Sequence, residues 1–281
     1  MQLTYFGTAA AEGFPGLFCS CPTCEKARRL GGRNIRTRSQ ALVNDDLLLD
    51  FCPDTYMHVL HGGLDLRRVK AVLITHGHDD HLYPDDFVYR VKGYCEMPDE
   101  SQKTPLPVYS SSDSGRYLRA NLAASRVAES DPNAIELHTV SPYQTYDIAG
   151  YRVTPLKAAH APRLDPLFYA IERDGKALLY CHDTGWFPEE TWNWLANCGK
   201  HFDFVSLDCT CIDDENAYHH HMGLHADADV KAKLLTLCCD GRTVFCVNHF
   251  SHNGHYVYDD LVPVAADLGF EVSYDGAVFT F

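Results

Sequence analysis

The sequence predicts an α/β fold in which metal-binding side chains gather at the ends of strands. Short apolar runs of strand length alternate along the chain with longer stretches of amphipathic, helical pattern. Histidine or aspartate follows several of these apolar runs directly. With 281 residues, 46% of them hydrophobic, the chain is long enough to bury a large core, and we expect one domain over residues 1–281.

The clearest apolar run is residues 71–75, which is typical of a buried strand and leads into His76, His78, Asp80 and His81. Alternate residues of an extended segment face the same way, so His76 and His78 are expected to point together. Imidazole nitrogens and carboxylate oxygens in one place suit zinc, manganese, iron or nickel. A His-x-His-x-Asp-His pattern directly after a buried strand therefore predicts a metal site.

The other elements follow from the same periodicities in chain order. Strands are expected at residues 3–8, 38–43, 47–50, 108–110, 139–147, 151–157, 167–173, 177–180, 202–208, 243–248 and within 270–281. Helices are expected at residues 25–29, 54–60, 84–94, 113–128, 188–196, 226–237 and 258–268. Turn residues at 44–46 and at 174–175 are expected to join neighbouring strands into hairpins.

Further candidate ligands follow other apolar runs. Asp50 could orient a metal-bound histidine, or it could simply be a turn residue. His160, taken alone, could also be a half-buried, hydrogen-bonded histidine. Asp183 could cap the helix that follows it. His249 comes directly after the last long apolar run.

A cysteine cluster stands near the N-terminus. Cys19-x-Cys21-x-x-Cys24 places three thiols in one turn. A tetrahedral structural zinc needs four ligands, so the fourth would come from elsewhere, and a set of buried free thiols is the alternative. We expect the other nine cysteines to be reduced and mostly buried; they are Cys52, Cys95, Cys181, Cys198, Cys209, Cys211, Cys238, Cys239 and Cys246.

The overall charge limits the classes of partner. A formal net charge of −14 argues against a broad nucleic-acid surface, which requires clustered lysine and arginine. The sequence has neither a long uncharged apolar run nor a signal-type N-terminal segment. We therefore expect no membrane span and a cytoplasmic protein.

The order of the candidate ligands resembles that of the metallo-β-lactamase superfamily. The matching positions are Asp50, His76, His78, Asp80, His81, His160, Asp183 and His249. The resemblance implies an αββα four-layer sandwich, with two stacked β-sheets, helices outside and a dimetal site at one edge. It also implies the ligand sets: His76, His78 and His160 for the first metal, Asp80, His81 and His249 for the second, and Asp183 as the bridge.

The cysteine cluster refines the resemblance. It is similar to that of PhnP-like phosphodiesterases, in which three cysteines and a histidine hold a structural zinc. Here His252, three residues after His249, has the matching spacing and would complete a site with Cys19, Cys21 and Cys24. The same cysteine pattern also resembles PqqB-type proteins, so the cluster does not fix the substrate.

A histidine-rich segment contains the candidate acid. By the PhnP-like resemblance, His221 is the expected general acid for a departing alkoxide, or a stabiliser of developing charge. His219, His220 and His225 compete for this role. A solvated loop with incidental metal affinity is the alternative.

The resemblance leads us to expect a hydrolase with two divalent active-site metals (Zn, Mn, Ni or Fe) and one structural Zn. The expected substrate is a small phosphodiester, linear or cyclic, attacked by a metal-held hydroxide, with Asp80, Asp183 and His221 in catalysis. Alternatives are a thioester or lactone hydrolase, a di-iron or PqqB-like oxidoreductase, and a non-enzymatic metal-binding protein. A tRNA-processing nuclease fits the acidic charge poorly. No nucleic-acid or membrane partner is expected, and a homodimer stays open.

Overall fold

The computed structural model describes residues 1–91, 93–96, 104–124 and 134–281, and its strands there form two seven-stranded sheets. The first sheet has the order β14 (Val278–Thr280), β1 (Gln2–Gly7), β2 (Gln40–Val43), β3 (Leu47–Leu49), β4 (Ala71–Leu73), β5 (Leu106–Ser110) and β6 (Ile135–Thr139). The second has the order β13 (Glu271–Val272), β12 (Val244–Asn248), β11 (Phe204–Asp208), β10 (Lys176–Cys181), β9 (Leu167–Arg173), β8 (Tyr151–Lys157) and β7 (Tyr146–Ile148).

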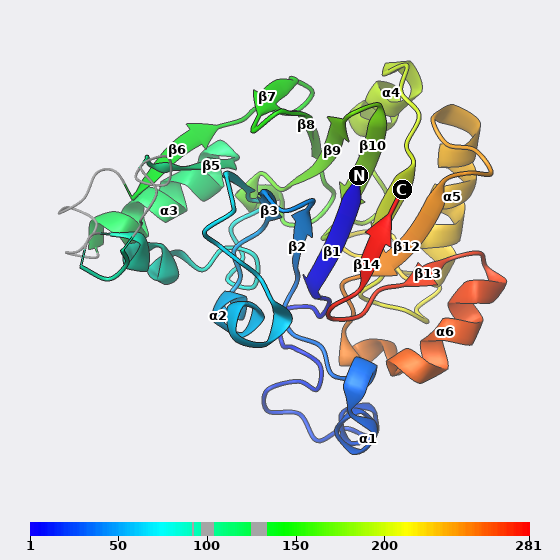
Figure 1. Cartoon of the computed structure of the whole chain (residues 1–281). Helices are drawn as coiled ribbons and strands as arrows, with labels where there is room; N and C mark the ends of the chain where they lie inside the picture. The colour runs from blue at the N-terminus through cyan, green and yellow to red at the C-terminus, as the bar shows by residue number, and fades with distance from the viewer. Residues whose placement is uncertain (92, 97–103, 125–133) are drawn as a thin grey trace.

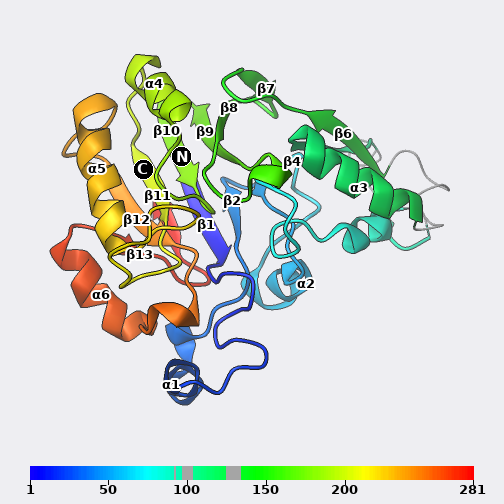
Figure 2. The same cartoon turned by 180° about the vertical axis from the view of Figure 1, so that it is seen from behind.

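The helical segments lie between and outside these strands. The α-helices are α1 (Pro22–Leu30), α2 (Thr55–Met57), α3 (Ser112–Ala124), α4 (Glu189–Asn197), α5 (Leu224–Leu237) and α6 (Tyr258–Asp267). Shorter turns are the 3₁₀ segments η1 (Gly32–Asn34), η3 (Pro84–Arg90), η6 (Pro162–Leu164) and η7 (His252–Gly254), and the π-type turn η2 (His58–Gly62). Figures 1 and 2 show α4, α5 and α6 on one side of the molecule and α3 on the opposite side.

Three apolar clusters define the layers. One packs the two sheets face to face, with Leu3 and Leu47 from the first sheet and Tyr169 and Phe204 from the second. Another covers the outer face of the second sheet with α4, α5 and α6, and a third covers the first sheet with α3 and η3. The expected αββα arrangement of two stacked sheets with helices outside is confirmed. Burial of this apolar surface is the main stabilising contribution to the fold.

The sheet topology brings the candidate ligands to one edge. β3 runs parallel to β4, and β10, β11 and β12 are mutually parallel neighbours, so their carboxyl ends meet at the same edge of each sheet. The backbone turns sharply there, because Asp50, Asp183 and His249 all have left-handed φ angles of 64°, 50° and 65°. Such angles are unfavourable for non-glycine residues and are retained where surrounding structure enforces them.

Two predicted elements differ from the structure. The strand expected at 139–147 is wrong: β6 ends at Thr139 and β7 starts at Tyr146. Pro142 and the left-handed Tyr143 (φ 66°) make a turn between them. The helix expected at 84–94 is a 3₁₀ turn that ends at Arg90. In the helix expected at 113–128, residues 125–128 lie outside the described residues.

Within the described ranges, no helix is both long and apolar enough to cross a membrane.

Candidate metal centre

The first ligand group consists of three histidines that follow two different strands. His76 Nε2 lies 2.8 Å from His78 Nδ1, which lies 3.1 Å from His160 Nε2. Three nitrogens bound tetrahedrally to one zinc ion at about 2.0–2.1 Å would be roughly 3.3 Å apart. The observed separations are slightly shorter than this, so little movement would be needed for these atoms to share one ion.

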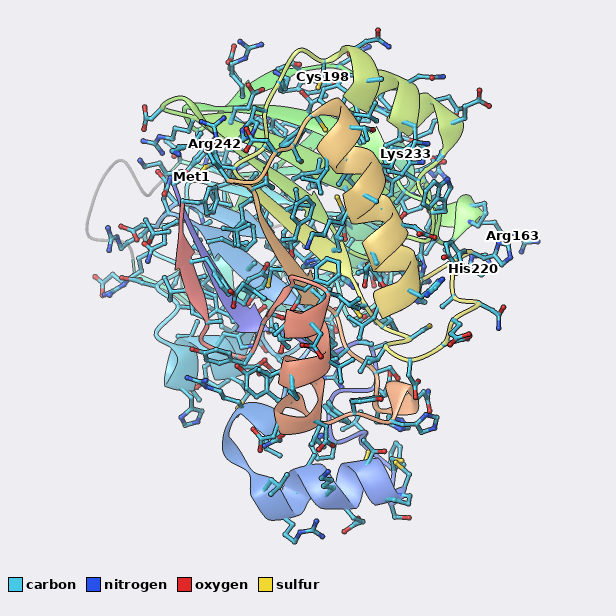
Figure 3. All side chains as sticks on the ribbon, turned by 90° about the vertical axis from the view of Figure 1, so that its right-hand side faces the viewer. Met1, Arg163, Cys198, His220, Lys233 and Arg242 are labelled. Carbon is cyan, nitrogen blue, oxygen red and sulfur yellow. The ribbon has the colours of Figure 1, made fainter. Side chains whose placement is uncertain are left out.

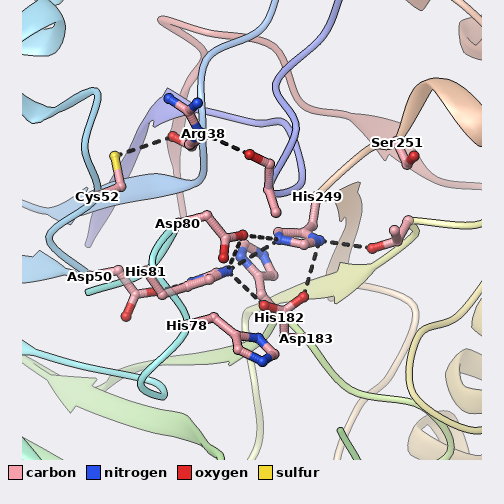
Figure 4. A network of polar contacts seen from close by, with 12 residues as sticks. Arg38, Asp50, Cys52, His78, Asp80, His81, His182, Asp183, His249 and Ser251 are labelled. Carbon is pink, nitrogen blue, oxygen red and sulfur yellow. Dashed lines mark hydrogen bonds and ion pairs between the residues drawn. The ribbon is translucent and has the colours of Figure 1, made fainter. Parts of the chain in front are cut away.

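The second group lies beside the first and is fully buried. His81 Nε2 lies 3.2 Å from Asp80 Oδ2, 3.2 Å from His249 Nε2 and 2.6 Å from Asp183 Oδ2. Asp183 Oδ2 is also 3.3 Å from His76 Nε2 of the first group. Figure 4 shows Asp183 between His81 and His249, with Asp80 on the opposite side. The carboxylate of Asp183 is thus placed to contact two ions at once.

The charge of this cluster fits bound cations. Four buried aspartates contact the histidines of the cluster: Asp50, Asp80, Asp183 and Asp208. Asp50 and Asp80 contact His81, and Asp208 contacts His249. Buried carboxylates without compensating positive charge are costly. Asp183 Oδ1 is also buried and makes no hydrogen bond of good geometry among the described residues, although His249 Nδ1 lies 3.2 Å from it. Divalent ions would satisfy both requirements, so the residues present fit a dimetal site.

The titration behaviour of the cluster supports the same interpretation. Burial opposes charge on His81, but the carboxylates of Asp183, Asp80 and Asp50 raise the pKa of His81 well above its ordinary value. Burial likewise opposes charge on Asp183, but His249 and His81 lower its pKa. Without metal, a proton on His81 therefore supplies part of the positive charge that the cluster requires.

Asp50 makes the contact with His81 that the expected orienting role requires. Its Oδ2 lies 2.6 Å from His81 Nδ1, and Thr75 donates to the same carboxylate through its backbone N–H (2.7 Å) and hydroxyl (3.0 Å). This contact keeps the proton on Nδ1 of a neutral His81 and leaves Nε2 for a metal. The alternative reading of Asp183 as a helix cap is wrong, because α4 starts after Pro188.

A third cluster was only partly anticipated. His221 Nδ1 lies 3.0 Å from Asp208 Oδ2 and 3.4 Å from Asp183 Oδ1. Asp208 Oδ1 accepts from the backbone N–H groups of Thr210 (3.0 Å) and Met222 (3.1 Å), so its position is fixed. Sequence reasoning missed Asp208, although it too is an aspartate at the end of an apolar run.

This third cluster contains the groups of a possible ion site: Asp183, Asp208, His221 and His249. We interpret it instead as a set of groups that hydrogen-bond to the proposed metal ligands and orient them. If His249 binds a metal through Nε2, its Nδ1 keeps a proton, and that nitrogen faces Thr210 Oγ1 at 2.8 Å and Asp183 Oδ1 at 3.2 Å.

The structure distinguishes the four loop histidines. His219, His220 and His225 are exposed, whereas His221 is partly buried against the centre. His220 still has a role in the loop, since its Nδ1 lies 2.8 Å from the carbonyl of His160, and His160 Nδ1 lies 3.0 Å from the carbonyl of His220. Figure 3 shows His220 on the loop before α5, on the same side of the molecule as Arg163.

The cysteine cluster forms a separate candidate site. Cys19, Cys21, Cys24 and His252 each place one ligand atom within 4.8 Å of the others. His252 Nδ1 lies 3.7 Å from Cys19 Sγ and 3.6 Å from Cys21 Sγ. Zinc bonds of about 2.3 Å to sulfur and 2.0–2.1 Å to nitrogen at a tetrahedral angle give an S···N separation of roughly 3.6 Å. The geometry therefore fits the expected Cys3His zinc site.

The protonation of the thiols also favours an ion. Burial would raise the pKa of Cys21, but hydrogen bonds from the Cys24 backbone and the neighbouring Cys19 thiol lower it to about 6. Burial and the nearby thiols raise the pKa of Cys24 to about 12. The Cys21 thiol thus ionises readily, and its negative charge disfavours ionisation of the Cys24 thiol. A zinc ion would stabilise all three cysteines as thiolates.

We expect Cys21→Ser to destabilise the protein, because a hydroxyl is a poor zinc ligand and Cys21 tethers α1 to the His252 turn. A loss of about 2 kcal/mol is within the usual range for losing a structural metal contact, which corresponds to a fall in Tm of roughly 3–4 °C at this chain length. Thermal unfolding monitored by circular dichroism, with zinc content measured in parallel, tests this.

The matched control for Cys21→Ser is Cys95→Ser, which alters a thiol outside both clusters. It should leave Tm and zinc content unchanged. Equal Tm values for Cys21→Ser and the unmodified protein would contradict the structural role of the site.

The nine remaining cysteines are unpaired, and six of them are buried, as expected: Cys52, Cys181, Cys209, Cys238, Cys239 and Cys246.

Comparison with known proteins places this centre in a family. Residues 46–250 match the model of the beta-lactamase superfamily domain, a span that includes the candidate dimetal ligands His76 to His249. The chain belongs to the metallo-β-lactamase superfamily. The fold observed here, with two mixed seven-stranded sheets and helices outside, is that of this superfamily.

Sequence similarity to individual proteins covers only part of the chain. A 95-residue segment is 32% identical to coenzyme PQQ synthesis protein B of Methylobacterium radiotolerans and 35% identical to the protein of that name from Methylobacterium nodulans. In both comparisons the segment covers 29% of this chain and 31% of the relative. The match thus spans about a third of the length of these two relatives.

Two solved structures share the whole fold. A structure described as a new diphosphatase from the PhnP family is similar with a TM-score of 0.74 and 19% identity, over 100% of this chain and 96% of the other. Zn²⁺-bound PqqB from Methylobacterium extorquens is similar with a TM-score of 0.75 and 20% identity, over 100% of both chains. These similarities support the metallo-β-lactamase fold and do not separate the two branches.

Proposed function

We propose that this protein is a metal-dependent hydrolase that cleaves a small phosphodiester. The observation that carries the proposal is the placement of His221 beside the ligand cluster, with Asp208 3.0 Å from its Nδ1 and the His160 ring 4.7 Å away. The side chain of His221 is 26% exposed, so its outer edge is accessible to a substrate. A histidine in this position can donate a proton to a leaving oxygen next to the metals.

The chain would hold two divalent ions through the ligand sets described above. When bound, such ions supply positive charge for the phosphoryl oxygens and activate a water. His76, His78 and His160 would hold one ion, and Asp80, His81 and His249 the other, with Asp183 between them. Asp50 keeps His81 in the tautomer that presents Nε2.

Asp208 and His221 would handle the proton. The Asp208 carboxylate accepts from Nδ1–H, which would leave the opposite nitrogen, Nε2, to carry the proton for a substrate. After Nε2 gives its proton to the leaving oxygen, the neutral ring stays hydrogen-bonded to Asp208. The similarity of the cysteine cluster and of the fold to the PhnP family supports a phosphate ester as the substrate class.

A paired assay tests this proposal. We expect turnover of bis(p-nitrophenyl) phosphate in the presence of Mn²⁺, Zn²⁺ or Ni²⁺, and roughly tenfold or more lower kcat/KM for p-nitrophenyl phosphate, since the monoester lacks a second ester group for the site to recognise. Cyclic ribose phosphates should be tested in parallel. If all phosphodiesters are inert while a thioester or lactone is hydrolysed, the phosphodiesterase assignment fails.

The match to coenzyme PQQ synthesis protein B favours one second candidate, a PqqB-like oxidoreductase. Metal content and the phosphodiester assay together separate the two, because the similar PqqB structure itself holds Zn²⁺. Iron in protein purified without added metal would support redox chemistry, whereas phosphodiester turnover with zinc or manganese would support hydrolysis.

The remaining features of the proposal concern organisation and partners. We propose one domain over residues 1–281 and a small-molecule substrate rather than nucleic acid, in keeping with the net charge of −14.

A further inference from the structure

A buried polar chain lies behind the proposed metal centre and is not used by the proposed chemistry. Asn248 Nδ2 lies 3.2 Å from Nδ1 and 3.3 Å from Nε2 of His182, so the amide sits over the imidazole ring. His182 Nε2 lies 2.6 Å from Ser206 Oγ, which lies 2.6 Å from the Tyr5 hydroxyl. Asn248 Oδ1 accepts from the Ser273 hydroxyl. All five side chains are fully buried.

This polar chain connects the strands that supply two proposed ligands. His182 is the first residue after β10 and directly precedes Asp183. Asn248 is the last residue of β12 and directly precedes His249. Ser206 belongs to β11, the strand between them. His182 therefore contacts a side chain of the adjacent strand β11 and one of β12, the strand beyond it, and Tyr5 extends the contact to the other sheet. Figure 4 shows His182 immediately beside Asp183.

The two ligands of these strands meet across the strand between them. Two strands on either side of a third are roughly 9–10 Å apart, yet Asp183 Oδ1 and His249 Nδ1 are 3.2 Å apart. The two ligands lean toward each other across β11, each from a left-handed backbone conformation that carries intrinsic strain. Side-chain contacts that span all three strands behind their ends, as those of His182 do, can hold that arrangement.

We propose that His182 is a positioning residue that, through Ser206 and Asn248, fixes the separation of Asp183 and His249 and so sets the affinity for the second metal ion. The proposal rests on the proposed function in one respect: Asp183 and His249 must be metal ligands. It assigns no contact between His182 and the metals or the substrate.

Optical titration with Co²⁺ tests this in protein that keeps Zn²⁺ in the Cys3His site and has no metal at the centre, because the visible absorption bands of Co²⁺ report both affinity and coordination geometry. The variants are His182→Phe, which keeps a ring but cannot bond to Ser206, and Asn248→Ala, which removes the amide over the ring. We expect each to weaken the second Co²⁺ by about 10–100-fold, the usual effect of losing an orienting partner, and to alter its bands. The double variant should be no weaker than the worse single variant, since the two residues act through one contact.

Two further variants separate positioning from general stability. Tyr5→Phe removes the far end of the polar chain and should lower Tm while leaving Co²⁺ affinity unchanged. His182→Gln retains an amide that can bond to Ser206, so its affinity should lie between those of the unmodified protein and His182→Phe. If His182→Phe does not fold, His182→Gln and Asn248→Ala give the same comparison.

The outcomes are distinct. Co²⁺ affinities of the His182 and Asn248 variants within about threefold of the unmodified protein, or single effects that multiply in the double variant, would overturn the positioning role while leaving the metal centre intact. Failure of the unmodified protein to bind two Co²⁺ ions would instead contradict the proposed metal centre itself, and with it this role.

Discussion

Replacing Asp183 with alanine is expected to abolish turnover and to lower the metal content of the centre below two ions per chain. Asp183 Oδ2 lies within 3.3 Å of both His76 and His81, so it serves both halves of the centre. Loss of an outer partner already costs about 10–100-fold in metal affinity, and loss of the bridging ligand should cost more. Elemental analysis and the phosphodiester assay measure the two effects.

The backbone at this position requires a second variant. Asp183 has a φ of 50°, and alanine in that conformation costs about 1–2 kcal/mol. Asparagine tolerates it better, so Asp183→Asn removes the charge with less strain. Asp79→Ala is the matched control, because Asp79 is an exposed aspartate of the same motif that belongs to none of the ligand groups. Two bound metals and full activity in Asp183→Asn would refute the bridging assignment.

Replacing His221 with alanine is expected to slow cleavage of alkyl phosphodiesters by about 10²–10⁴-fold, the range for loss of a general acid. Metal content should not change, because His221 is not among the proposed ligands. The effect should be much smaller for p-nitrophenyl esters, since nitrophenolate leaves without a proton. Steady-state kinetics on an alkyl and a nitrophenyl diester with the same metal measure the difference.

The pH dependence gives a second measure of the same role. Burial lowers the pKa of His221, but the charge of Asp208 and its hydrogen bond raise it to about 9 in the metal-free protein. A general acid must be protonated, so kcat should fall as the pH rises through the pKa of His221. Removing the Asp208 charge with Asp208→Asn should move that fall to lower pH.

His219→Ala is the control for His221→Ala, because His219 is an exposed histidine of the same loop. It should retain normal kinetics with both kinds of leaving group. Equal losses for alkyl and nitrophenyl esters in His221→Ala would argue that this residue does not donate the proton, whatever the size of the loss.

Local spacing in the sequence was enough to predict one cluster of candidate ligands and most of the elements, whereas His160, Asp183 and His249 were assigned by the resemblance to the metallo-β-lactamase superfamily. His76, His78, Asp80 and His81 fall within six residues of one strand end, so their proximity needs no knowledge of the fold. The cysteine cluster is local for the same reason. The strand at 139–147 was mispredicted because its apolar and aromatic residues are typical of strands, while the turn depends on Pro142 and a left-handed Tyr143.

Which side chains from distant strand ends contact one another is visible only in the tertiary structure. Asp208 is one of several aspartates after apolar runs, and only the neighbouring positions of β10, β11 and β12 place it beside His221 and Asp183. The same adjacency brings His182 onto Asn248, 66 residues away. Among four loop histidines, burial against the centre selects His221. Which side chains are suited to bind metal follows from residue type and local spacing, and both are visible in the sequence. The order of strands in the sheet determined which side chains support them, because those contacts join residues that are distant along the chain.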